Sequence, residues 1–342
     1  MANIPTFTLN NGRQMPSIGM GCWMGIPGGA ERVYNMVSKS IVVGYRHFDT
    51  AAGYQNESQV GKAIRDSGIP REEFFITTKL GNGSHSQVEQ AFEASLTELN
   101  VDYVDLYLMH WPQATRTVGV WGDDSLREDE SPTYIETWKS MEKLLQTGPD
   151  FLAFYSSQHR HEIDHSIGKV KSIGVSNFSI KTLTRLLPEC TILPAVNQIE
   201  LHPYYPQNAL KAFCDERGIH ITAYSPLGQP STEDSPVPSL VKDSTVTTIS
   251  KKHDATNGQV LLTWGVLRGT SVIPKSENED RMRQNITLLK LDDEDMNALN
   301  EVHTKPGLHR TLLSHYHKNG TMFGWTWEQL GWNLNQDGTW KA

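Results

Sequence analysis

The feature that most constrains the fold is a repeated alternation of short β-forming runs with helix-forming stretches. The β-forming runs are residues 17–21, 46–49, 74–80, 105–110, 169–177, 195–202, 220–225 and 271–275. Most are followed by a helix-like stretch, for example 57–67, 88–99, 133–145, 181–187 and 208–217. Strands separated by helices pair in parallel through right-handed crossovers. Eight such units predict a closed (β/α)₈ TIM barrel, in a single domain over residues 1–342.

A hairpin is predicted ahead of the first barrel strand. Asn11-Gly12 lies between two short extended runs within residues 7–15. This dipeptide is typical of the tight turns that join antiparallel strands, because both of its residues tolerate a positive φ. The barrel is therefore expected to begin after an N-terminal hairpin.

Polar side chains gather where the predicted strands end. Asp49, Lys79 and His110 each close one run, and two further runs close on Ser176-Asn177 and on Lys275-Ser276. Barrels of this type carry their chemistry at the C-terminal ends of the strands. We therefore expect these residues to surround one site.

One helix-to-strand connection is unusually long. Residues 149–168 lie between a helical stretch and the run at 169–177, where about 2–6 residues are usual. Such connections lie on the face of a barrel opposite the chemistry. Two hypotheses stand equally for this atypical insertion: a translated retained intron or gene-model error, and a genuine surface insertion.

Charge and cysteine usage exclude several classes of partner. The net charge of -8 gives no electrostatic reason to expect nucleic-acid or membrane binding. No apolar run approaches the roughly 20 residues that span a bilayer, and no secretion signal opens the chain. Cys22, Cys190 and Cys214 are too far apart to form a disulfide framework. We expect a cytoplasmic monomer or weak dimer that acts on a small molecule.

Two short motifs do not support a function. Gly19-Met-Gly21 is followed by Cys22-Trp23, so it is not the G-x-G-x-x-G pattern of dinucleotide-binding sheets. The run from His161 to His165 matches the H-E-x-x-H pattern of zinc proteases. It is short, lies on the wrong face of the predicted barrel and has no obvious third ligand. We expect no metal.

Four residues on three strand ends form the most specific pattern. Asp49 and Tyr54 follow one strand, Lys79 ends the next and His110 ends the one after. Singly, each has a structural explanation, such as solvation for Lys79 or a barrel hydrogen bond for His110. Together they resemble the signature of the aldo-keto reductase family, and the resemblance covers nearly the whole chain. The C-terminal segment is similar to fungal members, so the chain looks closest to fungal aldehyde and polyol reductases of the glycerol or xylose type.

The chemistry of the four residues agrees with reduction of a carbonyl group, which needs hydride at carbon and a proton at oxygen. Free tyrosine has a pKa of about 10, and an adjacent ammonium stabilises its phenolate. Lys79, paired with Asp49, can supply that charge, so Tyr54 can act as a general acid near neutral pH. His110 can donate to the carbonyl oxygen and orient it. We expect reduction of small aldehydes or aldoses to alcohols, reversible toward polyol oxidation.

The resemblance also implies the cofactor and the residues that bind it. NADPH is the expected cofactor, with NADH as a secondary one. The implied contacts are Ser176, Asn177 and Gln198 at the nicotinamide amide, Tyr224 stacked on its ring, Ser225 and Leu227 beside the pyrophosphate, Lys275, Ser276 and Arg281 at the 2′-phosphate, and Asn285 at the adenine.

The predicted phosphate segment contains acidic residues that oppose a strict preference for NADPH. Glu277, Glu279 and Asp280 lie between Ser276 and Arg281. Of the three, Glu277 is the best placed to face the ribose, where a carboxylate accepts hydrogen bonds from the hydroxyls of NADH. We expect NADPH to be preferred, but less strongly than by relatives with a neutral segment.

An apolar pocket is expected around the reacting carbonyl. Trp23 and Trp111 are placed to form its walls beside His110, and the C-terminal loop and tail at 303–342 are expected to overhang it. Gly81 stands where some relatives carry a bulky aromatic residue, which predicts a wider or more polar pocket.

Two other functions provide alternatives to the reductase. A barrel that lacks catalysis could bind the cofactor as a sensor or channel-associated subunit, but a missing member of the tetrad would be expected, and all four are present. A zinc hydrolase would depend only on the run from His161 to His165. Mixing the protein with NADPH and a reactive aldehyde, and following the absorbance of the nicotinamide, distinguishes the three functions.

Overall fold

The barrel predicted from the sequence is present and closed. This computed structural model describes residues 4–117, 124–146, 168–229, 238–313 and 320–341. Its parallel strands follow one another in chain order around the barrel. They are β3 (Met20–Gly21), β4 (His47–Asp49), β5 (Phe75–Leu80), β6 (Leu106–Met109), β7 (Ile173–Ser176), β8 (Val196–Glu200), β9 (His220–Tyr224) and β10 (Ser271–Val272).

The first and last strands close the barrel through a short set of backbone contacts. Ile18 and Val272 form a parallel bridge. The Gly19 N–H donates to the carbonyl of Val272 at 2.9 Å, and the Val272 N–H donates to the carbonyl of Ser17 at 2.8 Å. All eight predicted strands are confirmed, and this closure makes β3 and β10 neighbours although they lie at opposite ends of the chain.

Two glycines at the start of the barrel allow close contact with a neighbour on each side, His47 of β4 at one and the backbone after β10 at the other. A Cβ added at Gly19 would lie 2.5 Å from His47 Nδ1, and one at Gly21 would lie 2.7 Å from the carbonyl oxygen of Ile273. Both distances are shorter than van der Waals contact allows. The Gly19-Met-Gly21 motif therefore serves barrel packing, which agrees with its rejection as a dinucleotide fingerprint.

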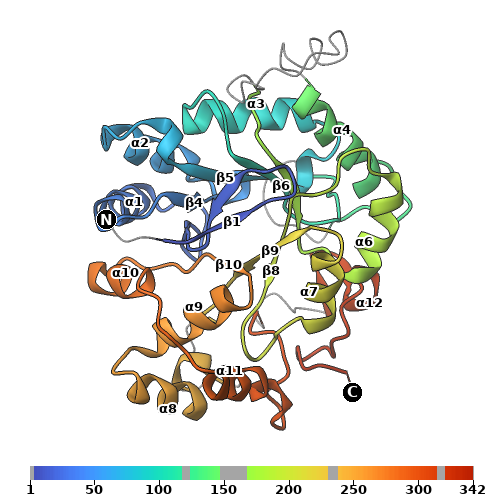
Figure 1. Cartoon of the computed structure of the whole chain (residues 1–342). Coiled ribbons are helices and arrows are strands. Elements are labelled where there is room, and N and C mark those ends of the chain that lie inside the picture. The colour runs from blue at the N-terminus through green and yellow to red at the C-terminus, as the bar shows by residue number, and fades with distance from the viewer. Residues whose placement is uncertain (1–3, 118–123, 147–167, 230–237, 314–319, 342) are drawn as a thin grey trace, which may run out of the picture.

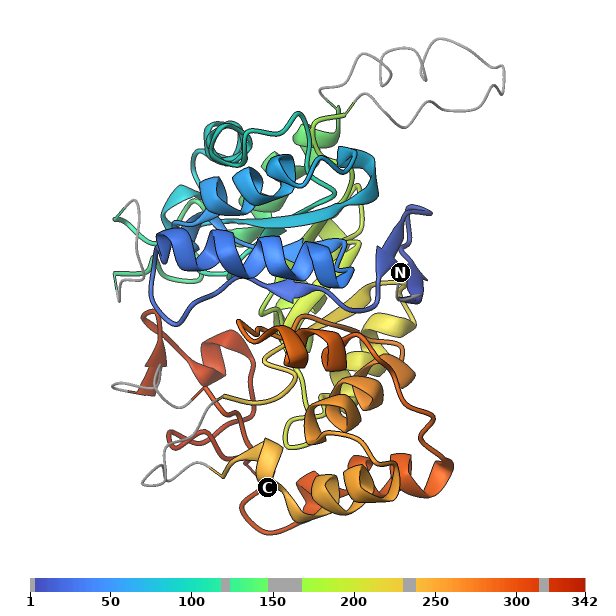
Figure 2. The ribbon, with the colours of Figure 1, turned by 90° about the vertical axis from the view of Figure 1, so that its left-hand side faces the viewer.

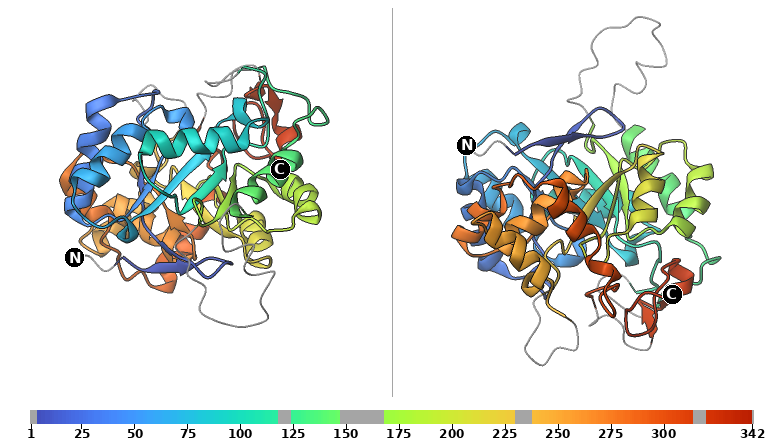
Figure 3. Two further views of the ribbon diagram at one scale, coloured as in Figure 1. Left: turned by 90° about the horizontal axis from the view of Figure 1, so that it is seen from above. Right: turned by 60° about the horizontal axis from the view of Figure 1, so that its bottom comes forward.

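Helices surround the strands on the outside of the barrel, as Figure 1 and the two views of Figure 3 show. Their apolar faces pack on the strands, where the largest buried side chains include Trp138 and Trp264. The helices are α1 (Ala30–Val43), α2 (Glu57–Asp66), α3 (Val88–Leu99), α4 (Tyr134–Gln146), α6 (Ile180–Leu186), α7 (Asn208–Asp215), α8 (Ser244–Lys252), α9 (Asn257–Leu267), α10 (Glu279–Asn285) and α11 (Asp293–Asn300).

The predicted hairpin covers the end of the barrel where the strands begin. Strands β1 (Thr6–Thr8) and β2 (Gln14–Pro16) pair antiparallel, and Gly12 in the turn has a φ of 84°. Leu9 and Met15 pack in one cluster with residues at the starts of strands, including Phe75 and Val196. The hairpin therefore leaves the opposite end of the barrel uncovered, and Figure 2 shows the C-terminal segment at that end.

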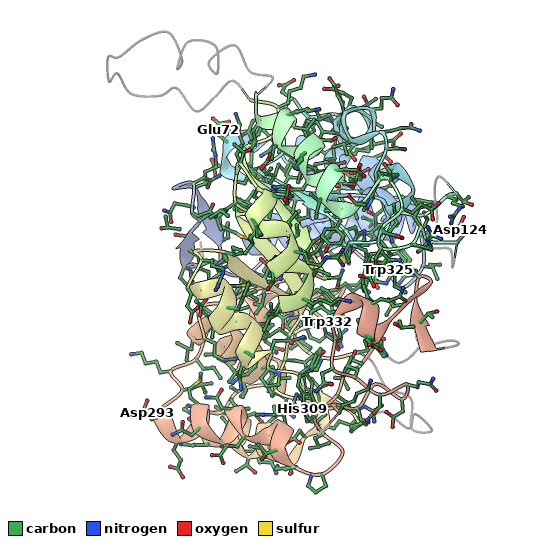
Figure 4. The ribbon with its side chains drawn as sticks, turned by 90° about the vertical axis from the view of Figure 1, so that its right-hand side faces the viewer. Glu72, Asp124, Asp293, His309, Trp325 and Trp332 are labelled. Carbon is green, nitrogen blue, oxygen red and sulfur yellow. The ribbon has the colours of Figure 1, made fainter. Side chains whose placement is uncertain are left out.

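The C-terminal segment packs on that opposite end. It contains β11 (Thr321–Met322), β12 (Trp325–Thr326) and α12 (Trp327–Leu330). Gln113 Nε2 donates to the carbonyl of Met322 at 2.9 Å, and Trp325 Nε1 donates to the carbonyl of Leu126 at 2.7 Å. Figure 4 places Trp325 and Trp332 where this segment meets the barrel. Most of the described tryptophans of the tail thus pack inward, although Trp340 is 38% exposed.

Part of the atypical insertion lies outside the described residues. Helix α4 ends at Gln146 and the described residues resume at Gly168, so residues 149–167 of the insertion, which include the run from His161 to His165, lie outside them. Lys169, which follows, pairs with Glu93 of α3 at 2.7 Å. Among the described residues, no helix is long and apolar enough to cross a membrane.

Candidate active site

Strands β4 and β5 place Lys79 beside Asp49 and Tyr54. Lys79 Nζ lies 2.5 Å from Asp49 Oδ1, 2.9 Å from the carbonyl oxygen of Thr50 and 3.3 Å from Tyr54 Oη. Asp49 and Lys79 end neighbouring parallel strands, and Tyr54 closes the short 3₁₀ turn Ala52–Tyr54 that follows β4. Three of the four tetrad residues are thus in direct contact.

The buried Lys79 ammonium has an acceptor for each of its three donors. Its side chain is fully buried, and that of Asp49 is 2% exposed. Gln198 Nε2 donates to the second carboxylate oxygen of Asp49 at 2.6 Å. A buried charge is tolerated when it is paired and its hydrogen bonds are made. Burial opposes the charged form of Lys79, but Asp49 and Tyr54 outweigh it, so the pKa of Lys79 is raised.

His110 follows β6 and completes the constellation. Its ring centre lies 5.6 Å from that of Tyr54, with the two planes nearly perpendicular. Burial and the nearby Lys79 ammonium lower the pKa of His110 well below 6.5. The imidazole is therefore neutral at physiological pH. It can form one hydrogen bond with a substrate oxygen, but it does not act as a positively charged acid.

A second polar network lies next to the tetrad, at the ends of β7, β8 and β9. Asn177 Nδ2 donates to the carbonyl of His110 at 2.9 Å and contacts Ser176 Oγ at 3.1 Å. Tyr224 Oη donates to Asn177 Oδ1 at 2.8 Å. Asn177 has a φ of 64°, which directs its side chain into this network. Ser176 Oγ donates to the carbonyl of Gln198 at 2.9 Å, and the Gln198 side chain donates to Asp49. Hydrogen bonds therefore link the residues expected at the nicotinamide to the tetrad.

Aromatic rings line the space next to Tyr54. The Trp23 ring lies 5.0 Å from that of Tyr54, and the Trp111 ring packs edge-on against Phe323 at 5.2 Å. A pocket is lined by Trp111, Asn177, Tyr224 and, from the tail, Met322 and Trp327. Trp111 lines this pocket, whereas Trp23 is not among its lining residues, so the apolar substrate pocket between the two tryptophans stays a prediction. Phe323 and Met322 were not among the predicted residues, because no local pattern shows where the tail meets the barrel.

The residues expected at the pyrophosphate and adenine come from separate segments that meet at Gly258. A Cβ at Gly258 would lie 3.6 Å from Asn285 Oδ1 and 3.9 Å from Leu227 Cδ2. Ser225 has a φ of 48°, which turns the chain out of β9 toward Leu227.

The residues expected at the 2′-phosphate lie in the link between β10 and α10 and in the first turn of α10. Ser276 is buried, while the Lys275 side chain is 35% exposed. Arg281 lies in the first turn of α10, and its N–H donates to Asn278, the residue that caps this helix. Lys275 Nζ contacts Glu277 Oε1 at 2.6 Å, and Glu277 also accepts from Arg32 of α1. Arg32 was not predicted, since it lies far away in the sequence.

Within the described ranges, no three His, Cys, Asp or Glu side chains are grouped so that they could hold a metal ion. The absence of a metal stays a prediction, because the run from His161 to His165 lies outside those ranges.

Comparisons with known proteins extend these observations. A model described as the aldo/keto reductase family matches residues 17–304. The chain is 40% identical to glycerol 2-dehydrogenase (NADP(+)) of Saccharomyces cerevisiae, over 89% of this chain and 93% of that protein. It is 37% identical to aldehyde reductase YPR1 of the same yeast, over 90% and 93% respectively. A crystal structure of a Bombyx mori aldo-keto reductase in complex with NADP superposes with a TM-score of 0.75 at 36% identity, and covers 88% of this chain and 93% of that one.

Proposed function

The chain belongs to the aldo/keto reductase family, and we propose that it uses NADPH to reduce aldehydes and ketones to alcohols, with Tyr54 as the proton donor. The observation that carries the proposal is the contact of the buried Lys79 ammonium with both Asp49 and Tyr54. The names of the two yeast relatives, a glycerol 2-dehydrogenase and an aldehyde reductase, support small aldehydes or aldoses as substrates and reversibility toward polyols.

Tyr54 is the proton donor because its conjugate base has a stabilising charge beside it. When Tyr54 protonates the carbonyl oxygen, the phenolate that remains faces the Lys79 ammonium at 3.3 Å. Asp49 and the Thr50 carbonyl keep that ammonium charged and in place. A cation fixed where negative charge develops lowers the barrier without reorganisation during the reaction.

His110 has a different role, because its imidazole is neutral. We assign it the task of donating one hydrogen bond to the carbonyl oxygen while Tyr54 delivers the proton. Trp23, Trp111 and Phe323 exclude water from the reacting carbonyl, which strengthens both interactions. The carbonyl oxygen would thus lie between Tyr54 and His110, whose rings are 5.6 Å apart.

The donor set beside Tyr54 fits a nicotinamide ring. Bound NADPH would supply the hydride to the carbonyl carbon. Asn177, Ser176 and Gln198 present amide and hydroxyl groups that match a carboxamide, and the half-buried Tyr224 presents a ring face on which an aromatic ring can stack. The crystal structure of the related silkworm protein in complex with NADP supports the same cofactor.

We expect the pocket to be wider or more polar than in relatives that carry a bulky aromatic residue at the position of Gly81. A Cβ at Gly81 would meet no other atom within 4 Å. The space left by the missing side chain supports this expectation. The C-terminal segment contacts Trp111 through Phe323 and lines a pocket together with Trp111 through Trp327, so we assign substrate selection to it.

We further propose that the protein acts in the cytoplasm as a monomer or weak dimer. All three cysteines are free, and Cys22 and Cys214 are buried. Free thiols support a reducing compartment.

A substrate panel in both directions tests the proposed function. Oxidation of NADPH in the presence of an aldehyde, measured as a loss of NADPH absorbance, supports the reductase. Binding of NADPH without turnover of any carbonyl in the panel would favour the sensor or channel-associated alternative instead.

A further inference from the structure

Arg32 and Glu277 meet across the seam where the barrel closes. Helix α1 follows β3, and α10 follows β10, which are neighbours at the closure. The two helices lie side by side in Figure 1. Arg32 Nη2 donates to Glu277 Oε1 at 2.8 Å, and Arg32 Nε donates to Glu277 Oε2 at 3.1 Å. The guanidinium thus holds both carboxylate oxygens, in the two-point geometry that arginine also offers to phosphate.

Glu277 is held from a second side by Lys275. Lys275 Nζ lies 2.6 Å from Glu277 Oε1. The hydrogen bonds from Arg32 and Lys275 lower the pKa of Glu277 to about 2. One carboxylate therefore lies between two cations, and a cation assigned to the 2′-phosphate already has an anionic partner.

A role in stability does not explain Arg32 well. Its side chain is 60% exposed, and exposed ion pairs contribute little because water screens them. Arg32 also lies in the first turn of α1, where the helix dipole disfavours a positive charge. The position is better explained by an anion that approaches the seam from solvent.

On the basis of the proposed function, we propose that Arg32 is a cofactor-discriminating residue. In the free protein Arg32 and Lys275 hold Glu277, and in the NADPH complex the 2′-phosphate takes the place of that carboxylate between the two cations. With NADH, which has no phosphate there, both cations remain on Glu277. Glu277 is then less available to the ribose hydroxyls.

The 2′-phosphate and the Glu277 carboxylate compete for the same two cations, and their charges determine which of them binds. A phosphate monoester carries about −1.5 to −2 charges at pH 7 and has three acceptor oxygens. Glu277 carries one negative charge and two acceptor oxygens. The phosphate therefore interacts more strongly with the same pair of cations, while Glu277 swings toward solvent, to which its side chain is already 36% exposed.

The test measures binding rather than turnover. Dissociation constants for NADPH and NADH are obtained from quenching of tryptophan fluorescence in the full chain, for wild type, Arg32→Ala, Glu277→Gln and the double variant. Lys39→Ala is the matched control, because Lys39 is an exposed cation on the same helix α1. Adenosine 2′,5′-bisphosphate and adenosine 5′-monophosphate repeat the comparison without the nicotinamide.

The double variant separates direct contact with phosphate from an effect through Glu277. Arg32→Ala is expected to weaken NADPH binding about tenfold in the Glu277→Gln background, as expected for loss of a charge-assisted contact, and to leave NADH binding unchanged. The control should change neither. Equal NADPH affinities of Glu277→Gln and the double variant would overturn the inference but leave the proposed function intact. Failure of wild type to bind either cofactor would overturn both.

Discussion

Lys79 Nζ lies 3.3 Å from Tyr54 Oη. The Lys79 side chain has no exposed surface. This contact joins a residue that ends β5 to one in the turn after β4. The Tyr54 hydroxyl is therefore the one group in the proposed site that combines a labile proton with a fixed counter-charge for its anion.

Tyr54→Phe tests this relationship directly. The variant keeps the ring that packs on Trp23 and His110 and loses only the hydroxyl. We expect turnover to fall about 10²–10⁴-fold, the usual contribution of a positioned general acid, while the dissociation constant for NADPH stays the same. Tyr34→Phe, which removes a hydroxyl bonded to Asp66 at the surface, is the matched control. Near-normal turnover of Tyr54→Phe would refute the mechanism.

The tetrad was predictable because strand order determines which strand ends are neighbours. Asp49, Lys79 and His110 end consecutive strands, so a parallel barrel brings them together once the strands are recognised. The contact of Arg32 with Glu277 was not predictable in this way. It depends on how two loops leave the closure seam, and neither loop has a periodic pattern. Phe323 was missed for the same reason, because the tail contacts the barrel through single side chains and backbone carbonyls rather than through a regular element.

Stability is expected to fall as the pH decreases from 7 to 5. Burial lowers the pKa of His47 and His220 to about 4 and that of His85 to about 3, while unfolded histidine titrates near 6.5. Below about pH 6.5 the unfolded chain therefore binds more protons than the folded one, which favours unfolding. Glu57 acts in the opposite direction, because burial raises its pKa to about 7. Its effect is smaller than that of the three histidines together, so we still expect a net loss of stability.

Thermal unfolding at several pH values checks this expectation. His85→Gln should lose less stability between pH 7 and pH 5 than wild type, because one of the buried groups no longer titrates. If the variant and the wild type lose the same stability between pH 7 and pH 5, titration of His85 does not contribute to the pH dependence.

Activity should not depend on a metal ion. No metal-binding cluster occurs among the described residues, and the proposed site completes its charge balance with Asp49, Lys79 and Tyr54 alone. Incubation with a chelator should leave the rate of NADPH oxidation unchanged. Inhibition that zinc restores would show that the run from His161 to His165 is a real site.

We propose that the segment at 149–168 is dispensable. It joins α4 to β7, and helix-to-strand links lie on the face opposite the catalytic strand ends. Joining Gly148 to Lys169 should leave kcat and KM unchanged and stability equal or higher. Loss of activity in a deletion variant that still folds, as judged by circular dichroism, would contradict this. A retained intron and a surface insertion both predict this result, so sequencing of the transcript is needed to distinguish the two origins.

Cofactor preference provides the last prediction. NADPH should be preferred over NADH, because Lys275, Arg281 and the Ser276 hydroxyl offer charge-assisted hydrogen bonds of about 1.5–3 kcal/mol each to a phosphate. The preference should be weaker than in relatives with a neutral segment, since Glu277 pairs with Lys275 and Arg32 before the cofactor arrives. Removing that competitor with Glu277→Ser or Glu277→Asn should increase the preference. Arg281→Ala should reduce NADPH affinity and spare NADH.

The deciding measurement is kcat/KM with both cofactors for the wild type and these variants. Glu277 and Arg281 affect the ratio in opposite directions only if both act at the phosphate. A change of the same size for both cofactors would instead indicate damage to α10, since Arg281 lies in its first turn. Equal or better efficiency of wild type with NADH would overturn the choice of NADPH. It would leave the reaction intact, because the proton donor Tyr54 lies in the turn after β4 and its counter-charge Lys79 lies on β5, away from the segment expected to bind the 2′-phosphate.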